Sequence, residues 1–139
     1  MSDDAGSGAE ALVRRFVERS WSAGDEMASA ALLGPGFTHH DLVTHAETDA
    51  TGYLSSILGL RSAFSSIELE IQDAISAGGR VAYRWIAVGD YRSTGATVRV
   101  DGISIDHVEN GRIVENWTAW DLRGLERQAP GLLDANGAT

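Results

Sequence analysis

The stretch Val98–Gln128, VRVDGISIDHVENGRIVENWTAWDLRGLERQ, decides the fold of this chain. Asn110-Gly111 lies near its centre. Both residues tolerate a positive φ, and such a pair between two alternating segments is a strong signal for a tight β-hairpin turn. The sequence therefore predicts a hairpin whose arms cover roughly Thr97–Val108 and Arg112–Asp121.

The two arms carry polar residues where a half-buried sheet ordinarily carries apolar ones. Side chains alternate between the two faces of a strand, so each arm has two distinct faces. The polar residues that share a face are Ser104 and Asp106 in the first arm, and Asn116 and Thr118, with Trp120, in the second. Burying Ser, Asp, Asn and Thr together is costly unless each finds a hydrogen-bonding partner. We interpret this face as the lining of a pocket.

The sequence before the hairpin changes from helical to extended patterning. We expect helices over residues 9–23, 26–33 and 53–64, an extended segment over 37–42, a polar loop over 46–52, and strands over 67–75 and 80–91. Gly34-Pro35-Gly36 is expected to end the second helix. After the hairpin, Leu122–Gln128 is expected to form a short helix with Asp121 as its N-cap.

Helices followed by an antiparallel meander are typical of an α+β fold, with the helices on one face of the sheet. We assign a single domain to residues 9–128. Residues 1–8 and 129–139 are expected to be flexible tails, because they lack an apolar period.

Composition narrows the classes of partner. The chain has 139 residues, enough for one domain with a core, and a formal charge of −9. This acidity argues against nucleic acid and membrane surfaces as partners. No apolar run approaches the roughly 20 residues of a membrane span, and the acidic start differs from a signal peptide, so we expect a cytoplasmic protein. The chain has no cysteine and no Gly-rich nucleotide motif, and no cofactor is implied.

Several segments together resemble a known family. These are NGRIVENWTAWDLRGLERQ at residues 110–128, FTHHD at 37–41, the helix that ends in Ala63-Phe64, and GGRVAYRWIAVGDY at 78–91. They resemble the SnoaL-like polyketide cyclases, which share a superfamily with nuclear transport factor two, ketosteroid isomerase and limonene epoxide hydrolase. The resemblance implies a cone-shaped, curved antiparallel sheet, packed by three N-terminal helices and enclosing a pocket.

The chain departs from this family where the chemistry is expected. The position of the cyclases' catalytic Asp falls on Thr118, and that of its partner His falls on Ser104. Neither hydroxyl acts as an acid or base near neutral pH. Asp106 stands where relatives often have an aromatic residue, and the linker between Arg92 and Val98 looks shorter than is usual in the family.

Asp106 is the first candidate for a general acid or base. A carboxyl group in an apolar-walled hollow has a raised pKa, which suits proton transfer near neutral pH. If the hairpin were shifted by one residue, Asp106 would face solvent and His107 would face inward.

Three further residues are candidates for catalysis. Arg84 alternates with Tyr83 and Trp85, and on the pocket face it would pair with Asp106 or bind a substrate oxygen; the alternative is a structural ion pair. His39 and His40 point to opposite sides of an extended segment, so only one faces inward, as a base or electrophile. The alternative for both is a surface position. Adjacent residues on one segment are poor metal ligands, so we expect no metal site.

Other residues are candidates for substrate contact. The predicted set is Ser104, Asn116, Thr118, Trp120, Tyr53 and Asp90. Tyr53, Trp85, Tyr91 and Trp120 would form an aromatic wall, although aromatics at such spacings are more often core or interface residues. Trp117, Ala119, Tyr83 and Trp85 are expected on the opposite, outer face. An apolar outer face predicts a homodimer.

These features predict a cofactor-independent cyclase or isomerase. It would act by acid and base chemistry on a hydrophobic, polyketide-type small molecule. One alternative is an epoxide hydrolase or epoxide-opening cyclase that uses Asp106, Arg84 and Asp90. The other is a non-catalytic protein that binds a hydrophobic ligand or serves as an accessory subunit, and it follows from the missing acid and base at Thr118 and Ser104.

Overall fold

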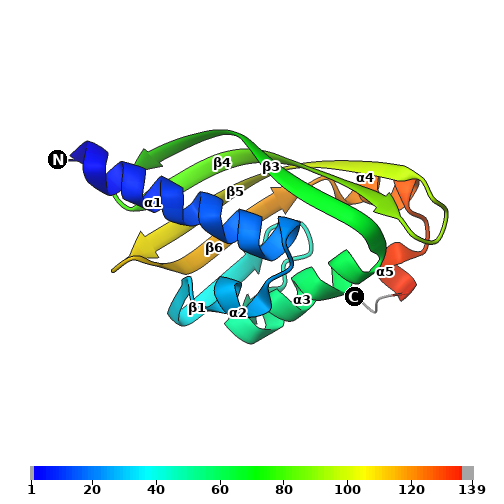
Figure 1. Ribbon diagram of the computed structural model, residues 1–139, viewed down its shortest axis with the longest axis horizontal. Helices are drawn as coiled ribbons and strands as arrows, with labels where there is room; N and C mark the ends of the chain where they lie inside the picture. The colour runs from blue at the N-terminus through cyan, green and yellow to red at the C-terminus, as the bar shows by residue number, and fades with distance from the viewer. Residues whose placement is uncertain (1, 136–139) are drawn as a thin grey trace.

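The computed structural model describes the backbone of residues 2–135 and the side chains of residues 8–133. Its helices are α1 (Ser2–Val17), the π-helical turn η1 (Glu18–Ser22), α2 (Glu26–Ala30), α3 (Ala50–Ser62), α4 (Leu122–Gln128) and α5 (Leu132–Ala135). Its strands are β1 (Leu33–Asp41), β2 (Glu47–Asp49), β3 (Phe64–Ala77), β4 (Arg80–Tyr91), β5 (Thr97–Glu109) and β6 (Arg112–Trp120) (Figure 1).

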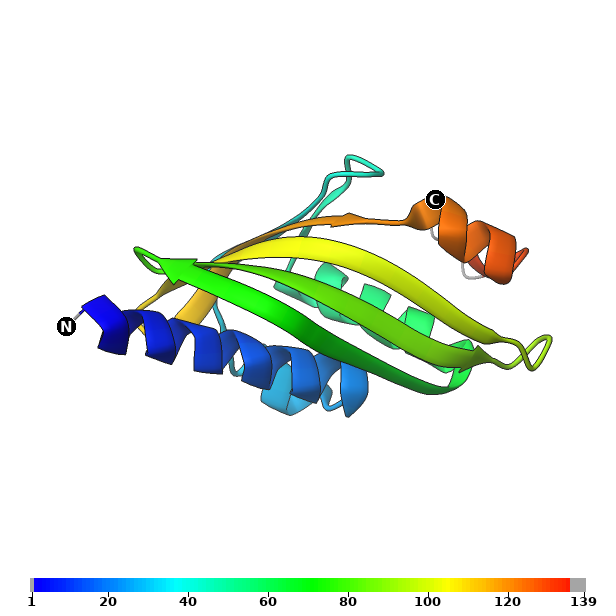
Figure 2. The ribbon, with the colours of Figure 1, turned by 90° about the horizontal axis from the view of Figure 1, so that it is seen from above.

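The strands form one sheet in the order β2-β1-β6-β5-β4-β3. Strands β3 to β6 are an antiparallel meander, and β1 pairs in parallel with β6. Figure 2 shows that β3, β4 and β5 curve along their length. The two edge strands are β2 and β3, so the sheet stays open rather than closing into a barrel.

The central hairpin confirms the prediction from the sequence. Asn110 and Gly111 both have a positive φ, of 51° and 74°, and they join β5 to β6. The short helix α4 also has the predicted bounds, and the carboxylate of Asp121 caps it by accepting a hydrogen bond of 2.9 Å from the Gly124 backbone N–H.

The helices α1, α2 and α3 enclose the core against the sheet. The helix α1 packs on β3 and β4, while α3 contacts β1, β2 and β3. Buried apolar side chains of both layers meet between them, among them Val13, Phe16, Tyr53, Ile57, Val81, Tyr83, Trp85, Val98, Val100 and Ile113. The predicted α+β fold with a curved sheet and three N-terminal helices is therefore confirmed.

Several local expectations differ from the structure. The first helix begins at Ser2 instead of Ala9, and its last predicted turn is π-helical. The second helix ends at Ala30, because Leu33 already pairs with Ile113 of β6. This strand includes Gly34-Pro35-Gly36, where the register of β1 against β6 shifts. Tertiary pairing overrides the helical pattern here.

Two segments that were expected to be a loop and a flexible tail are instead ordered parts of the fold. The polar loop at residues 46–52 holds β2 and the start of α3, whose N-cap is the Asp49 carboxylate. Near the C-terminus, Leu132 is buried in the core. The domain limits at residues 9 and 128 stay a prediction, and residues 1 and 136–139 of the expected tails lie outside the described residues.

None of the helices in the described residues 2–135 is both long enough and apolar enough to cross a bilayer.

Candidate active site

The inner face of β5 and β6 carries a buried polar cluster. In the observed register, Ser104 lies opposite Thr118 and Asp106 lies opposite Asn116. Asp106 is only 1% exposed. The prediction that Asp106 faces inward is therefore confirmed, and the shifted alternative is wrong because His107 lies on the outer side, with its Nε2 3.4 Å from Glu109.

Both oxygens of Asp106 accept a hydrogen bond. The Asn116 side-chain amide donates to Oδ1, and the Tyr83 hydroxyl donates to Oδ2 at 3.2 Å. Burial raises the pKa of Asp106 to about 7, against the opposing effect of these two hydrogen bonds. Near neutral pH the group is thus close to half ionised.

His39 lies at the other end of Asn116. Its Nδ1 is 2.6 Å from the carbonyl oxygen of the Asn116 side chain, and its ring stacks on Tyr53 with centroids 4.1 Å apart. Burial lowers the pKa of His39, and the hydrogen bond to Asn116 and the charge of Asp41 oppose this. The imidazole is therefore neutral near pH 7.

A chain of hydroxyl groups extends the cluster along the sheet. The Thr118 hydroxyl donates to the Asn116 carbonyl oxygen at 3.0 Å, and the Ser104 and Thr118 oxygens are 2.9 Å apart. The indole N–H of Trp85 donates to Ser104 at 3.0 Å. Because Thr118 already uses its hydrogen, Ser104 must be the donor to Thr118. We call Asp106, Asn116, His39, Thr118, Ser104, Tyr83 and Trp85 the inner network.

Two indoles flank Gly102 next to this network. Gly102 lies between Trp85 of β4 and Trp120 of β6 in the sheet register. The Trp85 ring lies so close to Gly102 that an added Cβ would collide with it. Trp120 donates its indole N–H to Asp41 at 2.9 Å. Trp85 and Trp120, two of the four aromatic residues expected to form a wall, therefore lie on either side of Gly102, and the wall as a ligand contact stays a prediction.

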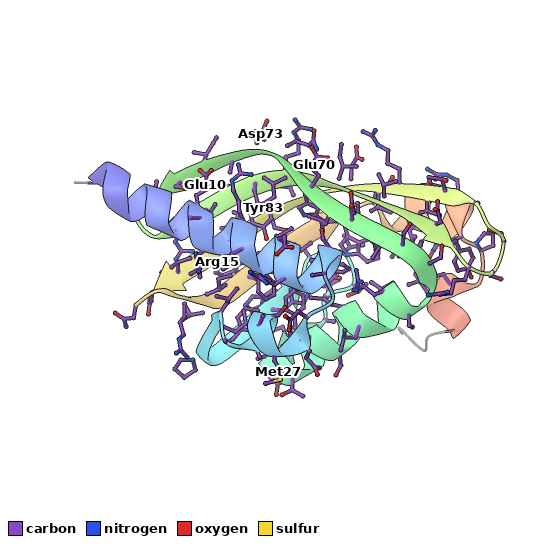
Figure 3. All side chains as sticks on the ribbon, in the orientation of Figure 1. Glu10, Arg15, Met27, Glu70, Asp73 and Tyr83 are labelled. Atoms are coloured by element: carbon purple, nitrogen blue, oxygen red, sulfur yellow. The ribbon has the colours of Figure 1, made fainter. Side chains whose placement is uncertain are left out.

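Arg84 does not join the network. It lies on the outer face with its side chain 53% exposed, and its guanidinium is 3.3 Å from Asp73. Figure 3 shows Asp73 and Glu70 at the outer margin of β3, while Tyr83 lies behind α1. The predicted pairing of Arg84 with Asp106 is wrong, because β4 turns Tyr83 and Trp85 inward.

Asp90 and His40 also lie away from the network. Asp90 accepts hydrogen bonds from Thr97 and Ser66 near the end of β4. His40 lies on the outer side, with one ring nitrogen 3.2 Å from Glu47 and the other 2.6 Å from Glu115. The set expected for an epoxide hydrolase, Asp106 with Arg84 and Asp90, is thus not assembled.

Sequence reasoning missed Tyr83 and was divided on Trp85. Tyr83 was expected on the outer face, and Trp85 was expected both there and in the aromatic wall, yet both are buried and hydrogen-bonded to the predicted pocket residues. A usable signal was present in β4: the set Val81, Tyr83 and Trp85 is bulkier and free of charge, whereas the alternate set contains Arg84.

The two best-formed hollows of the described structure lie away from the network. A cavity of about 10 Å³ lies between η1, α2 and α3, and an open groove of about 460 Å³ lies at Arg123, Glu126 and Arg127, and neither contains a network residue. His39, Thr118 and Trp120 are half-buried, so they form the accessible edge. Within the described side chains, no group of three or more His, Asp or Glu is arranged to hold a metal ion.

The arrangement combines a buried acid and a neutral imidazole, joined by one amide. His39 Nδ1 contacts Asn116, and Nε2 has no hydrogen-bonding partner among the described residues. Tyr83 and Tyr53 have raised pKa values because of burial and of the charge on Asp106, and both phenols stay protonated. The cluster therefore offers acid and base chemistry with neutral hydrogen-bond donors.

Comparison with solved structures reveals the same fold in several proteins. IdmH from Streptomyces antibioticus, a candidate polyketide cyclase, has a TM-score of 0.77 and 23% identity over 86% of this chain and 96% of that chain. AclR from Streptomyces galilaeus, a candidate hydroxylase, has a TM-score of 0.79 and 20% identity over 96% and 92%.

A protein of ketosteroid isomerase-like fold from Catenulispora acidiphila, in complex with trimethylamine, has a TM-score of 0.75 and 15% identity over 85% of this chain and 91% of that chain. No protein of curated function matches the sequence significantly. The family model of the SnoaL-like polyketide cyclases matches residues 11–129, almost the whole of the described domain. The chain therefore belongs to the SnoaL-like polyketide cyclase family.

Proposed function

We propose that this protein is a cofactor-independent cyclase or isomerase that acts on a neutral, polyketide-type carbonyl compound. His39 exchanges the proton with the substrate, and Asp106 supports it from the interior. The observation that carries this proposal is the connection of His39 to Asp106 through Asn116, with His39 half-buried and its Nε2 unpartnered among the described residues. A general base needs a free lone pair and a pKa near the working pH.

The proton balance of such a reaction is simple. His39 Nε2 takes a proton from the carbon next to a carbonyl group, which leaves an enolate and an imidazolium. The enolate carbon then attacks a second carbonyl of the same molecule, and the imidazolium returns the proton to the new alkoxide. In an isomerisation of a β,γ-unsaturated ketone the intermediate is a dienolate, and the imidazolium returns the proton to its γ-carbon.

The charges around the network favour a neutral substrate. Neither Asp106 nor His39 has an Arg among the groups that shift its pKa, and the chain contains no Lys. A carboxylate or phosphate on the substrate would therefore meet Asp106 and Asp41 without a compensating cation. The half-buried indole of Trp120 suits a flat, apolar ring system instead.

Proton transfer can be tested without knowledge of the natural substrate. We would follow, by NMR in D₂O, deuterium exchange at the activated methylene groups of 2-tetralone and of 1-phenylbutane-1,3-dione. We expect the wild type to accelerate exchange, and His39→Gln to lose about 100-fold or more of that acceleration. His107→Gln is the matched control on the outer face. Exchange at the buffer rate with wild type, or full activity of His39→Gln, would contradict the proposal.

A second candidate function is ligand binding without turnover. The observation that favours it is the hydroxyl pair of Ser104 and Thr118, 2.9 Å apart, at the positions where the resemblance implies His and Asp. This function is supported if 2-tetralone quenches tryptophan fluorescence on binding while exchange stays at the buffer rate.

We also propose a homodimer formed by the outer face of the sheet. Exposed aliphatic side chains gather there, with Ile75 76% and Ile103 57% exposed, next to Ile105 and Val88. A second copy would remove these side chains from water. Sedimentation equilibrium tests this state, and a monomer at about 100 μM would contradict it.

A further inference from the structure

We infer that Asp106 determines, through Asn116, which ring nitrogen of His39 carries the proton. This inference deepens the proposed function and rests on it only for its catalytic meaning. It assigns Asp106 as a positioning residue, since its carboxylate contacts Asn116 and Tyr83 and lies away from the accessible edge.

The direction of each hydrogen bond follows from the donors and acceptors available. An ionised carboxylate only accepts, so the Asn116 amide must turn its NH₂ group toward Asp106. The carbonyl oxygen of Asn116 then faces His39, and it also accepts from Thr118. A carbonyl oxygen cannot donate, so His39 Nδ1 carries the hydrogen. The free Nε2 is consequently a lone pair, the form that a base requires.

Protonation of Asp106 reverses these constraints. A carboxylic acid donates one hydrogen bond, so the Asn116 amide can rotate to present its carbonyl oxygen to Asp106 and its NH₂ group to His39. His39 Nδ1 then accepts, and the proton lies on Nε2. The hydroxyls of Thr118 and Ser104 can follow this reversal, because each hydroxyl both donates and accepts.

The other titratable groups around Asp106 and His39 do not determine which ring nitrogen of His39 carries the proton. Asp106 faces the phenols of Tyr83 and Tyr53, whose pKa values are raised, so both stay neutral. His39 also feels Asp41, which favours its charged form, and His40, which disfavours it. These two neighbours act on the charge of the ring and do not contact Nδ1, whose partner is Asn116. The choice between the neutral tautomers is therefore left to Asn116 and Asp106.

The experiment measures the tautomer directly. In protein labelled with ¹⁵N-histidine, long-range ¹H–¹⁵N spectra distinguish a protonated ring nitrogen from a bare one, and His39→Gln identifies the His39 signals. At a pH of about 8.5 we expect a protonated Nδ1 and a bare Nε2. As the pH falls through about 7, the Nε2 signal should move toward the protonated position before both nitrogens are protonated.

Asp106→Asn is the decisive variant, because it keeps the shape and removes the titration. We expect it to abolish the change of tautomer between pH values of about 8.5 and 6. Glu115→Gln, next to Asn116 but hydrogen-bonded to His40 on the outer side, should keep the wild-type behaviour. The inference is overturned if wild-type His39 carries its proton on Nε2 at high pH, or if Asp106→Asn shows the wild-type change.

The tautomer and exchange measurements separate the two proposals. A tautomer that follows Asp106, together with exchange at the buffer rate, supports the inference and contradicts the proposed catalysis. Accelerated exchange that depends on His39, with a tautomer indifferent to Asp106→Asn, supports the catalysis and overturns the inference. The wild-type titration does not depend on Asp106→Asn, so poor folding of that variant still leaves the inference open to refutation.

Discussion

In an ordinary half-buried sheet the apolar side chains face the core and the polar ones face solvent, but part of the β5–β6 hairpin shows the reverse. Ser104 and Asp106 are buried on the inner face, whereas their neighbours Ile103 and Ile105 are exposed on the outer face. The buried polar side chains are hydrogen-bonded to one another on the inner face. The apolar side chains on the outer face are left exposed. The inner face therefore buries paired polar groups, whereas the outer face exposes apolar side chains, and the proposed chemistry and self-association are assigned to these two faces respectively.

The contrast between the two faces predicts its largest effect on how the stability of the protein depends on pH. Asp106 has a pKa of about 7 in the folded protein, against an ordinary value of 3.8 for an aspartate side chain. Between these values the folded state holds a proton that the unfolded state releases, so this group makes stability fall as the pH rises from about 4 to 7. Asp106→Asn should match wild type near pH 4 and exceed it by at most about 4 kcal/mol at pH 8.

Urea unfolding at several pH values measures this difference. Asp101→Asn provides the control on the same strand, because Asp101 is exposed on the outer face. Equal pH profiles for wild type and Asp106→Asn would show that the inner carboxyl group is solvated, and the contrast between the two faces would disappear.

The substitution Asn116→Leu removes the residue that joins Asp106 to His39 in the inner network. The substitution removes the donor to Asp106 and the acceptor for His39, so we expect a loss of about 3 kcal/mol at pH 8 and a smaller loss at pH 5, where Asp106 is neutral. Chemical denaturation at both pH values checks it. A loss below about 0.5 kcal/mol, the range of ordinary surface substitutions, would contradict the interpretation.

Gly102→Ala tests the packing of the inner face. The new Cβ would collide with the Trp85 ring, so we expect a loss of about 2 kcal/mol and a shift in tryptophan fluorescence as the ring moves away from Ser104. Gly59→Ala in α3 is a matched control with open space around it, and it should stabilise the protein by about 0.5–1 kcal/mol. Losses of equal size in both variants would refute the assigned contact.

Ile103→Glu is expected to have the smallest effect on the fold. Ile103 is exposed and lies opposite Arg84, so the stability of the protomer should change by less than about 0.5 kcal/mol. Sedimentation velocity should show that self-association weakens. If the variant unfolds, or if it associates as wild type does, the outer face is not the proposed interface.

Much of the fold and part of the candidate site could be predicted from the sequence. The Asn110-Gly111 turn set the hairpin, and alternation from that turn placed Asp106, Asn116 and Ser104 on one face, as observed. The cap at Asp121 ended β6 and began α4 at the predicted residues. These features depend on local geometry and on a period of two, which the sequence displays directly.

The contributions of distant strands could not be predicted with equal success. Arg84 was expected inside and Tyr83 outside, because the pairing of β4 with β5 had to be guessed across the turn at Ser93–Gly95. A shift of one residue exchanges the two faces of a strand completely. Likewise, only the parallel pairing of β1 with β6 brings His39 to Asn116, and residues 77 positions apart meet there.

The sequence by itself determined the α+β class, the hairpin, the family, and the presence of an inward carboxyl group at Asp106. Only the tertiary structure decided which groups that carboxyl meets. The physical reason is that alternation and turn chemistry act over a few residues, whereas burial and hydrogen bonding between β1, β4 and β6 depend on register over the whole sheet. Asp106, Asn116 and His39 form a connected network because three strands meet in one register.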